Sequence, residues 1–229
     1  MISQFLQYFQ YEKNYSSHTV LSYHTDLLQF CDFLGLSPEE FSPAVITPGV
    51  IQQWVLFLME NSNSPRSISR KISTLKSFWR FLLVRRLTDE NPTLKLVLPK
   101  TKKPLPTFYR EQEMDNALSE NSRTGGFEAV RNRMIVELFY QTGLRVSELV
   151  SLRDSSIDFA SGQLRVIGKR NKERIIPLGE SVCAELKSYQ EVRNKETELP
   201  SDALFVRKNG MPMYSKAIYN IVHQKMSEV

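Results

Sequence analysis

The sequence has no long hydrophobic run and few cysteines. No stretch approaches the roughly 18 apolar residues that a transmembrane helix needs. The first residues show no basic region before an apolar core, so we expect no secretory signal peptide. Cys31 and Cys183 lie far apart, which favours reduced, buried thiols over a disulfide. These absences predict a soluble cytoplasmic protein with no membrane partner.

Length and composition are those of an ordinary globular protein. The 229 residues are 41% hydrophobic and 24% charged, which disfavours disordered, collagen-like and coiled-coil classes. At about 150 residues per domain, the chain forms one large domain or two modest ones. The net charge of +5 does not identify a partner by itself, so the distribution of the charge must be examined.

Residues 1–87 carry apolar residues at helical spacing, which predicts four helices joined by short polar loops. Ser16, Thr47-Pro48 and Ser64-Pro65 are start signals, because a hydroxyl side chain caps a helix and proline suits its first position. Gly35 is typical of a helix end. Residues 88–106 are rich in proline and lysine, which predicts an exposed linker between two domains.

Residues 107–229 are predicted to form a second, mostly helical unit with a small antiparallel sheet. Together the two units form a multi-domain, mainly α protein whose second domain is α+β. We expect helices at 110–121, 128–141, 145–152, 180–192 and 214–226. We expect a hairpin of strands at 163–167 and 173–178, and a third strand at 204–206.

Positive charge is concentrated in segment 64–86, which contains seven basic residues and no acidic one. Arginine, lysine and small hydroxyl residues on one helix face suit contacts with phosphate and sugar. The alternative is a solvated basic face. The candidate DNA-binding residues of this helix are Arg66, Arg70, Lys71, Lys76 and Arg80.

The predicted hairpin and the linker carry two further basic patches, which with the helix would suit a clamp around a nucleic-acid duplex. The linker contributes Lys102 and Lys103 as candidate DNA-binding residues. The hairpin contributes Arg170, Lys172 and Arg174.

Two residues are candidates for chemistry. Arg145 follows the helix break at Gly143, where its guanidinium can lie near free backbone N–H groups and hold a phosphate. The alternative is an arginine that simply pairs with Glu148, three residues on. Lys169 occupies the turn between the predicted strands. It is either solvated or inserted against a leaving oxygen.

Residues 142–149 (Thr-Gly-Leu-Arg-Val-Ser-Glu-Leu) and 166–174 (Val-Ile-Gly-Lys-Arg-Asn-Lys-Glu-Arg) resemble motifs of the tyrosine recombinase, or phage integrase, family. The chain is most similar to the bacterial Xer recombinases, and the resemblance extends over nearly its whole length. It implies a helical, SAM-like core-binding domain at 1–87 and a catalytic domain at 107–229.

The resemblance also implies a reaction. In this family a tyrosine attacks a DNA phosphodiester and forms a 3′-phosphotyrosyl bond, without a cofactor or metal. Arg145 would clamp the scissile phosphate, Lys169 would protonate the leaving oxygen, and Glu148 would support the site. The implied partners are a double-stranded core site, a homo- or hetero-tetramer with a sister recombinase, and a DNA translocase.

The sequence departs from the family pattern near its end. None of the three histidines, His18, His24 and His223, begins a His-x-x-Arg motif, and no tyrosine follows Tyr219. We interpret Tyr214 and Tyr219 as helix-packing residues rather than nucleophiles, and His223 as a surface or packing residue. The catalytic domain is therefore expected to be C-terminally incomplete and inactive as it stands, either as a fragment or as a naturally short chain.

A smaller departure is Arg170, where similar turns usually have glycine. Two functions compete with recombination. The first is a non-catalytic DNA-binding regulator of the same fold. The second is a helical protein-interaction module whose basic helix meets an acidic partner.

Overall fold

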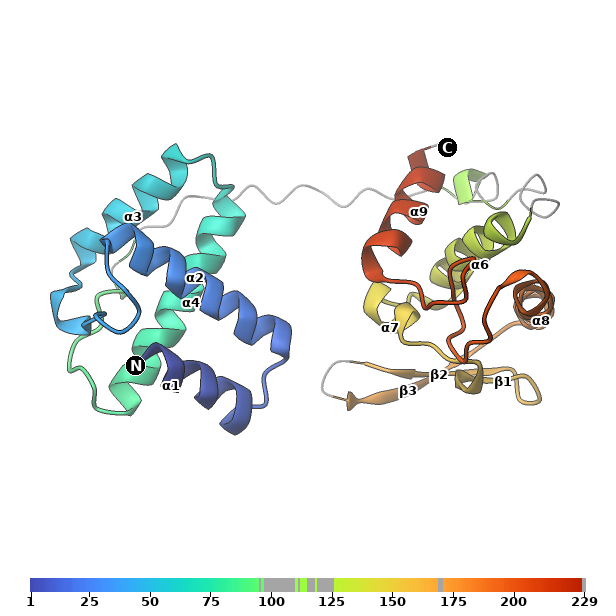
Figure 1. Ribbon diagram of the computed structural model, residues 1–229, viewed down its shortest axis with the longest axis horizontal. Coiled ribbons are helices and arrows are strands. Elements are labelled where there is room, and N and C mark those ends of the chain that lie inside the picture. The colour runs from blue at the N-terminus through green and yellow to red at the C-terminus, as the bar shows by residue number, and fades with distance from the viewer. Residues whose placement is uncertain are drawn as a thin grey trace. The chain divides into compact units, whose positions relative to one another are not determined.

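The computed structural model divides into two compact units, Met1–Leu105 and Pro106–Val229, each with its own core. It describes residues 1–94, 96, 110, 112–114, 118, 126–168 and 171–227. Figure 1 shows a helical first unit, and a second unit in which helices cover a small sheet.

The first unit contains the four predicted helices. These are α1 (Ile2–Gln7), which continues into a π-helical turn η1 (Tyr8–Glu12), α2 (Ser17–Leu34), α3 (Pro48–Glu60) and α4 (Pro65–Val84), with a 3-10 turn η2 (Pro43–Val45) before α3. The start signals act as predicted. The side chains of Ser16, Thr47 and Ser64 each accept a hydrogen bond from the backbone N–H three residues on. Gly35 ends α2 in the left-handed conformation, with φ of +66°.

Aromatic rings fill the core of the first unit. Trp54 and Trp79 are fully buried, and Phe30 lies between them with its ring centroid 4.9 Å from that of Trp54. Phe5 and Phe78 pack edge to face at 5.1 Å, which attaches α1 to α4. This packing leaves the polar face of α4 toward solvent.

The second unit consists of α6 (Phe127–Thr142), α7 (Val146–Val150), a 3-10 turn η4 (Asp154–Ser156), β1 (Ile157–Asp158), β2 (Gln163–Ile167), β3 (Glu173–Pro177), α8 (Glu180–Glu196) and α9 (Ser215–Ser227). The strands form an antiparallel sheet in the order β1-β2-β3, and Ile167 pairs with Glu173 at the end of the hairpin. The predicted hairpin is confirmed. The predicted helix 110–121 lies mostly outside the described residues.

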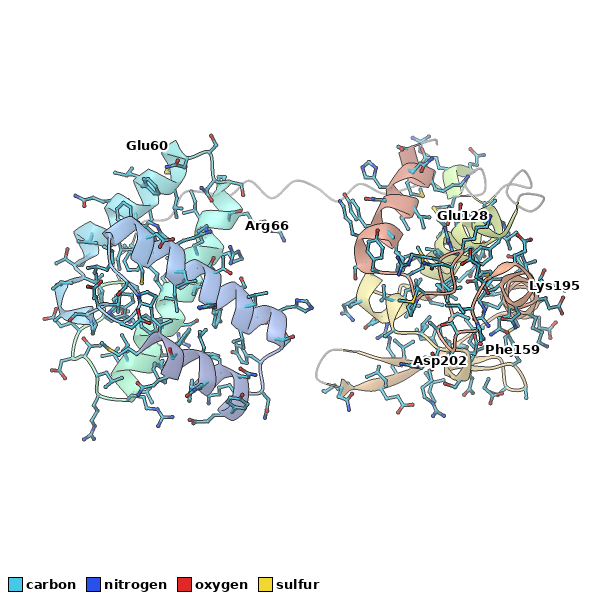
Figure 2. The ribbon with its side chains drawn as sticks, viewed as in Figure 1. Glu60, Arg66, Glu128, Phe159, Lys195 and Asp202 are labelled. Carbon is cyan, nitrogen blue, oxygen red and sulfur yellow. The ribbon has the colours of Figure 1, made fainter. Side chains whose placement is uncertain are left out.

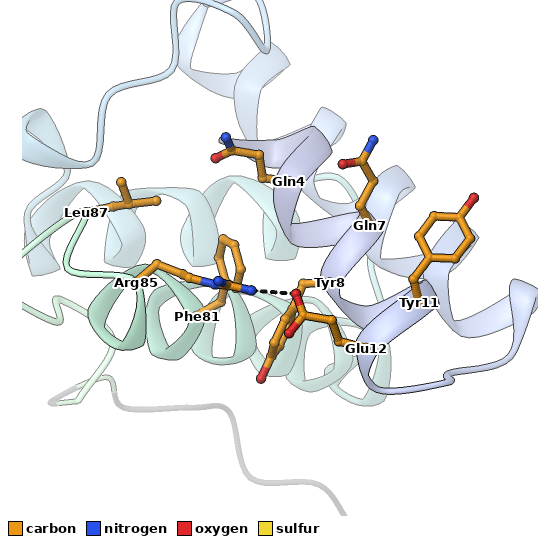
Figure 3. Close-up of a pocket in the computed structure, with 8 residues that line it drawn as sticks. All are labelled: Gln4, Gln7, Tyr8, Tyr11, Glu12, Phe81, Arg85 and Leu87. Carbon is orange, nitrogen blue, oxygen red and sulfur yellow. Dashed lines mark hydrogen bonds and ion pairs between the residues drawn. The ribbon is translucent and has the colours of Figure 1, made fainter.

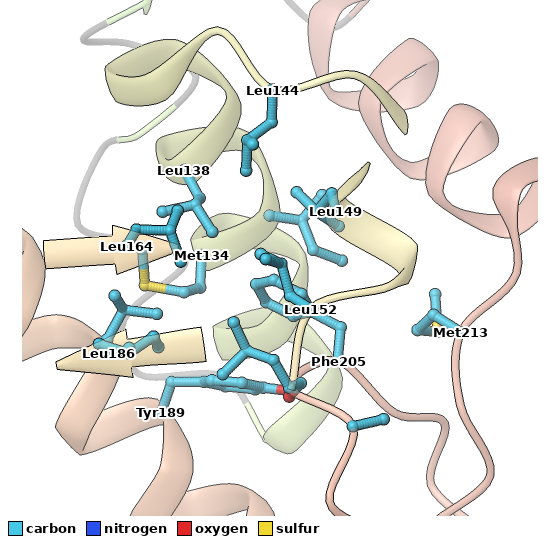
Figure 4. Close-up of a cluster of buried hydrophobic side chains, with 14 of the residues drawn as sticks. Met134, Leu138, Leu144, Leu149, Leu152, Leu164, Leu186, Tyr189, Phe205 and Met213 are labelled. Carbon is cyan, nitrogen blue, oxygen red and sulfur yellow. The ribbon is translucent and has the colours of Figure 1, made fainter. Parts of the chain in front are cut away.

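The core of this unit lies between the sheet and the helices. Leu138 of α6, Leu149 of α7, Leu164 of β2 and Leu186 of α8 are all fully buried, and Figure 4 shows them converging on one cluster. The sheet and three helices therefore share one apolar interior.

The predicted third strand at 204–206 is wrong, because β1 takes that place beside β2. Side chains bind the carbonyl groups of Ala203, Leu204 and Val206, and the backbone N–H of Met213 donates to the carbonyl of Phe205. Arg193 donates to the carbonyl oxygens of Ala203 and Leu204, Tyr189 donates to Leu204 at 2.9 Å, and Arg131 donates to Val206 at 3.2 Å. The segment is buried and apolar like a strand, but among the described residues its one bridge joins Val206 to Pro212, and the preceding residue Ala203 bridges Arg153.

Candidate active site

Arg145 owes its position to the break between two helices. α6 ends at Gly143, which adopts φ of +60°, and its N–H donates to the carbonyl of Phe139 at 2.9 Å. This is a left-handed cap that favours glycine. Leu144 is buried and fastens the turn to the core, whereas the side chain of Arg145 is 71% exposed at the start of α7. A guanidinium in this position can meet a ligand from solvent.

Glu148 holds Arg145 in place. One carboxylate oxygen, Oε2, accepts from the backbone N–H of Arg145 at 2.8 Å, and the other, Oε1, accepts from Nη1 of the same residue at 2.9 Å. The carboxylate thus fixes both the backbone and the guanidinium of Arg145. Pairing with Glu148 was the simpler alternative for Arg145, and the structure contains this pair.

Arg174 of β3 completes the cluster from the other side. Its Nη1 donates to Oε1 of Glu148 at 2.8 Å and its Nη2 to Oε2 at 2.9 Å, in a bidentate pair. Sequence analysis assigned Arg174 to DNA binding and missed this pair, because no local pattern connects residues 26 positions apart. We call Arg145, Glu148 and Arg174 the arginine–glutamate cluster.

Glu148 is buried and ionised. Hydrogen bonds from Arg174 and then from Arg145 lower the pKa of its carboxyl group from 4.5 to about 2, although burial acts in the opposite direction. Its side chain is only 4% exposed. With two guanidinium groups and one carboxylate, the cluster keeps one net positive charge, and the exposed Arg145 presents it to solvent.

Gly168 follows β2 and lies against this cluster. A Cβ atom there would be 3.2 Å from Oε1 of Glu148 and 3.4 Å from Nη1 of Arg174, so a side chain would crowd the ion pair. Lys169 and Arg170, the next two residues, lie outside the described residues. Asn171 follows with φ of +57°, so this turn does contain a left-handed residue.

The basic face of α4 is smaller than predicted. Arg66 and Arg80 are exposed and Lys76 is partly exposed, and Figure 2 shows Arg66 extending from the first turns of the helix. Lys71 is buried, with only 5% of its surface exposed, and it donates to Gln29 of α2. The prediction that Lys71 shares an exposed face with Arg66 and Arg70 is wrong in this respect.

Asp26 of α2 is the partner that sequence analysis missed on this face. Its Oδ2 atom accepts from Arg70 at 2.5 Å and from Thr74 at 2.7 Å, and its Oδ1 atom lies 3.9 Å from the Nζ atom of Lys71. Asp26 is fully buried. Segment 64–86 has no acidic residue of its own, but α2 supplies one from 44 positions away.

The other predicted residues have mixed outcomes. Lys172 is exposed, whereas Lys102 and Lys103 lie outside the described residues. Tyr214 and Tyr219 are each 53% exposed, so the prediction that they pack in the helix interface is wrong. His223 is an exposed residue of α9, with its ring 5.8 Å from that of Tyr219.

Several other features have no role in this site. Cys31 and Cys183 are free and buried, as predicted. Among the described residues, no group of three His, Cys, Asp or Glu side chains could hold a metal ion. None of the described helices has the length and apolar character that crossing a membrane requires.

The first unit has a pocket of about 470 Å³ that is separate from the arginine–glutamate cluster (Figure 3). Its lining includes Tyr8, Phe81 and the ion pair between Arg85 and Glu12, and no residue of the cluster.

Comparison with known proteins gives consistent matches over the whole chain. A family model of the phage integrase family matches residues 108–228, and that of the phage integrase N-terminal SAM-like domain matches residues 2–86. Tyrosine recombinase XerC of Halalkalibacterium halodurans is 34% identical, in an alignment covering 99% of this chain and 76% of the relative. Tyrosine recombinase XerD of the same organism is also 34% identical, covering 100% and 77%.

A solved structure shows the same fold. The crystal structure of a lambda integrase dimer bound to a COC' core site has a TM-score of 0.74, with 99% of this chain and 79% of that chain covered, at 17% identity. Arg145, Glu148 and Arg174 lie within the segment that the phage integrase model matches. The two domain models and the two relatives indicate the same family. The chain therefore belongs to the phage integrase family.

Proposed function

We propose that this protein is a site-specific tyrosine recombinase of the Xer type, which cuts and rejoins duplex DNA through a 3′-phosphotyrosyl intermediate. Family membership over nearly the whole chain supports the reaction class. The observation that carries the assignment of the site is the exposed guanidinium of Arg145, held from behind by a buried carboxylate.

Arg145 binds the scissile phosphate in this proposal. As a tyrosine attacks phosphorus and the bond to the 5′ oxygen breaks, negative charge grows on the non-bridging oxygens, and a guanidinium already fixed in position stabilises it without reorganisation. Neither Tyr214 nor Tyr219 is assigned as this nucleophile. Glu148 is a positioning residue, because it touches Arg145 and not the substrate. Lys169 as the general acid remains a prediction, since it lies outside the described residues.

DNA binding is assigned to a limited set of basic side chains, four on α4 and one in the hairpin; Arg153 and Arg165, which are also exposed, are not part of this set. Arg66, Lys76 and Arg80 of α4 and Lys172 of the hairpin would contact backbone phosphates, which fixes position without reading sequence. Arg70 would contribute only its half-exposed guanidinium, because Asp26 already holds one of its nitrogens. We expect a double-stranded core site and a tetramer on DNA. A sister recombinase, a DNA translocase and a cytoplasmic location remain predictions.

The test is formation of a covalent protein–DNA adduct. A target duplex is first selected from a random library by its binding to the 229-residue chain. The duplex is then incubated with the protein encoded by the whole gene, whatever its length, because these 229 residues contain no His-x-x-Arg sequence. We expect an adduct that survives denaturant and disappears after protease treatment. Arg145→Ala should reduce its rate of formation at least 100-fold, the range seen when one transition-state donor is removed. Specific duplex binding should persist, weakened by no more than the one phosphate contact that is lost.

Arg153→Ala is the matched control, because Arg153 is an exposed arginine of the same unit that pairs with Asp202. A normal adduct yield in Arg145→Ala would overturn the assignment of this residue. Specific binding without any adduct from the wild-type protein would favour the non-catalytic regulator. The absence of duplex affinity at physiological salt would favour the protein-interaction module.

A further inference from the structure

We infer that Arg174 is the positioning residue that lets Glu148 hold Arg145 without cancelling its charge. The inference rests on the proposed function and deepens it, because it names the residue that keeps the phosphate clamp cationic. It replaces the predicted role of Arg174 as a DNA-backbone contact.

The first argument is saturation of the carboxylate. A carboxylate has about four acceptor positions. Glu148 uses all four, with Arg145 Nη1 and Arg174 Nη1 on Oε1, and the Arg145 N–H and Arg174 Nη2 on Oε2. Without Arg174, both oxygens would lose one partner inside a site where water has little access, since the side chain of Glu148 is 4% exposed.

The second argument is charge. Arg145 and Glu148 alone form a neutral pair, and a neutral pair attracts a phosphate weakly. Arg174 adds one positive charge directly against the carboxylate, so the three groups together keep a net charge of one positive unit. The exposed fractions of the two arginines agree with separate roles: the side chain of Arg145 is 71% exposed and that of Arg174 is 38%.

The third argument is the connection between elements. Arg174 belongs to β3 and Glu148 to α7, so their bidentate pair joins the hairpin to the helix that begins with Arg145. Gly168 at the end of β2 leaves only enough room for this pair, as a Cβ there would be 3.2 Å from Glu148. A shift of the hairpin would therefore disturb Arg145.

The decisive experiment is a double-mutant cycle with Arg174→Gln and Glu148→Gln. We expect Arg174→Gln to slow adduct formation at least tenfold with DNA affinity within threefold of wild type. Adding Glu148→Gln should recover several-fold of the lost rate, because the uncompensated carboxylate is then gone. Arg165→Gln is the control: Arg165 is an exposed arginine on the adjacent strand that pairs with Glu173, and its variant should stay within twofold of wild type.

Opposite results would overturn the inference. If Arg174 contacts DNA directly, Arg174→Gln lowers affinity, and the slope of log affinity against log salt falls by about one unit. The double variant is then no better than the single one. A cleavage rate equal to wild type in Arg174→Gln would also overturn it. Arg174→Lys is the second variant if the glutamine variant unfolds, and it should be slow too, since lysine cannot form the bidentate pair.

A second readout separates this inference from the proposed function. The 229-residue chain is labelled with ¹⁵N-arginine and the NMR signals of its guanidinium groups are recorded. This measurement does not depend on DNA cleavage. We expect the Arg145 signals to shift and exchange faster in Arg174→Gln and to stay unchanged in Arg165→Gln. Unchanged Arg145 signals in Arg174→Gln would overturn the positioning role even if the wild type forms an adduct. Changed signals would support that role even if it forms none.

Discussion

Glu148 is a single acidic residue beside two arginines, and its ionisation contributes to folding. The Arg174 and Arg145 hydrogen bonds lower its pKa in the folded state to about 2, below the ordinary value of 4.5. A carboxyl group with a lowered folded-state pKa contributes stability above its unfolded pKa. That contribution is lost as the pH falls from about 4.5 through about 2. The residue that orients the clamp is thus also an acid-sensitive stabilising group.

Glu148→Gln should reduce the free energy of unfolding by about 2 kcal/mol at pH 7, since charged hydrogen bonds in a buried site are lost. The difference from wild type should shrink as the pH falls toward about 2, where the wild-type carboxyl group is protonated. Urea denaturation between pH 7 and pH 2.5 measures both values. A difference that stays constant over this range would contradict the role of Glu148 ionisation.

At the scale of elements, α2 and α4 are joined by a buried polar network centred on Asp26. Arg70 and Thr74 donate to one carboxylate oxygen, and Lys71 lies close to the other. Burial lowers the pKa of Lys71, while the charge of Asp26 raises it. Replacing one ion of a buried pair lowers the free energy of unfolding strongly when the remaining ion is left buried without a partner. The loss is much smaller when the remaining ion keeps other hydrogen-bond donors.

Asp26→Asn should therefore lower the free energy of unfolding by about 3 kcal/mol, since the buried cation of Lys71 loses its counter-charge. Lys71→Met should change the same quantity by less than about 1 kcal/mol, because Asp26 keeps Arg70 and Thr74 and the desolvation cost of the ammonium group disappears. Thermal and urea unfolding of the two variants provide the comparison. An equal loss of stability in both variants would contradict the conclusion that Asp26 is the centre of the network.

At the scale of the whole molecule, the net charge of +5 is modest and DNA affinity depends on its placement. The exposed residues of α4 and of the hairpin belong to separate compact units, each with its own core. Each basic side chain that neutralises a phosphate releases counterions, which makes affinity fall with salt. The number of such contacts is therefore measurable without knowledge of the target sequence.

Arg66→Gln together with Arg80→Gln should reduce the slope of log affinity against log salt by about two units, at about 0.9 per lost phosphate contact. Lys71→Met is the control for position, because it removes one positive charge from the same helix at a buried site. Its slope should equal that of wild type. Binding of a duplex at salt concentrations from 50 to 300 mM gives the three slopes, and a reduction in the control as large as one unit would show that Lys71 reaches DNA.

Much of the fold could be predicted from the sequence, because its signals are local. Ser16, Thr47 and Ser64 cap their helices by bonding three residues ahead, and Gly143 ends α6 because a left-handed residue is needed there. The hairpin was predictable from two short apolar runs around a polar turn. The position of Arg145 after the helix break was also predictable, because Gly143, two residues earlier, is a local signal for the end of α6.

Local patterns predicted the helices, the hairpin and a division into two units, whereas the role of Arg145 as a phosphate clamp came from the family resemblance and stays a prediction. Only the tertiary structure decided which cations are free. Asp26 pairs with Arg70, 44 positions away, and lies close to the buried Lys71. Glu148 pairs with Arg174, 26 positions away. Side chains of α6 and α8 donate to the carbonyls of Val206 and Leu204, in the segment predicted as a third strand. Short-range hydrogen bonds can be predicted because both partners are close in the sequence. The partner of a buried charge depends on which elements pack together, and this is decided only by the tertiary structure.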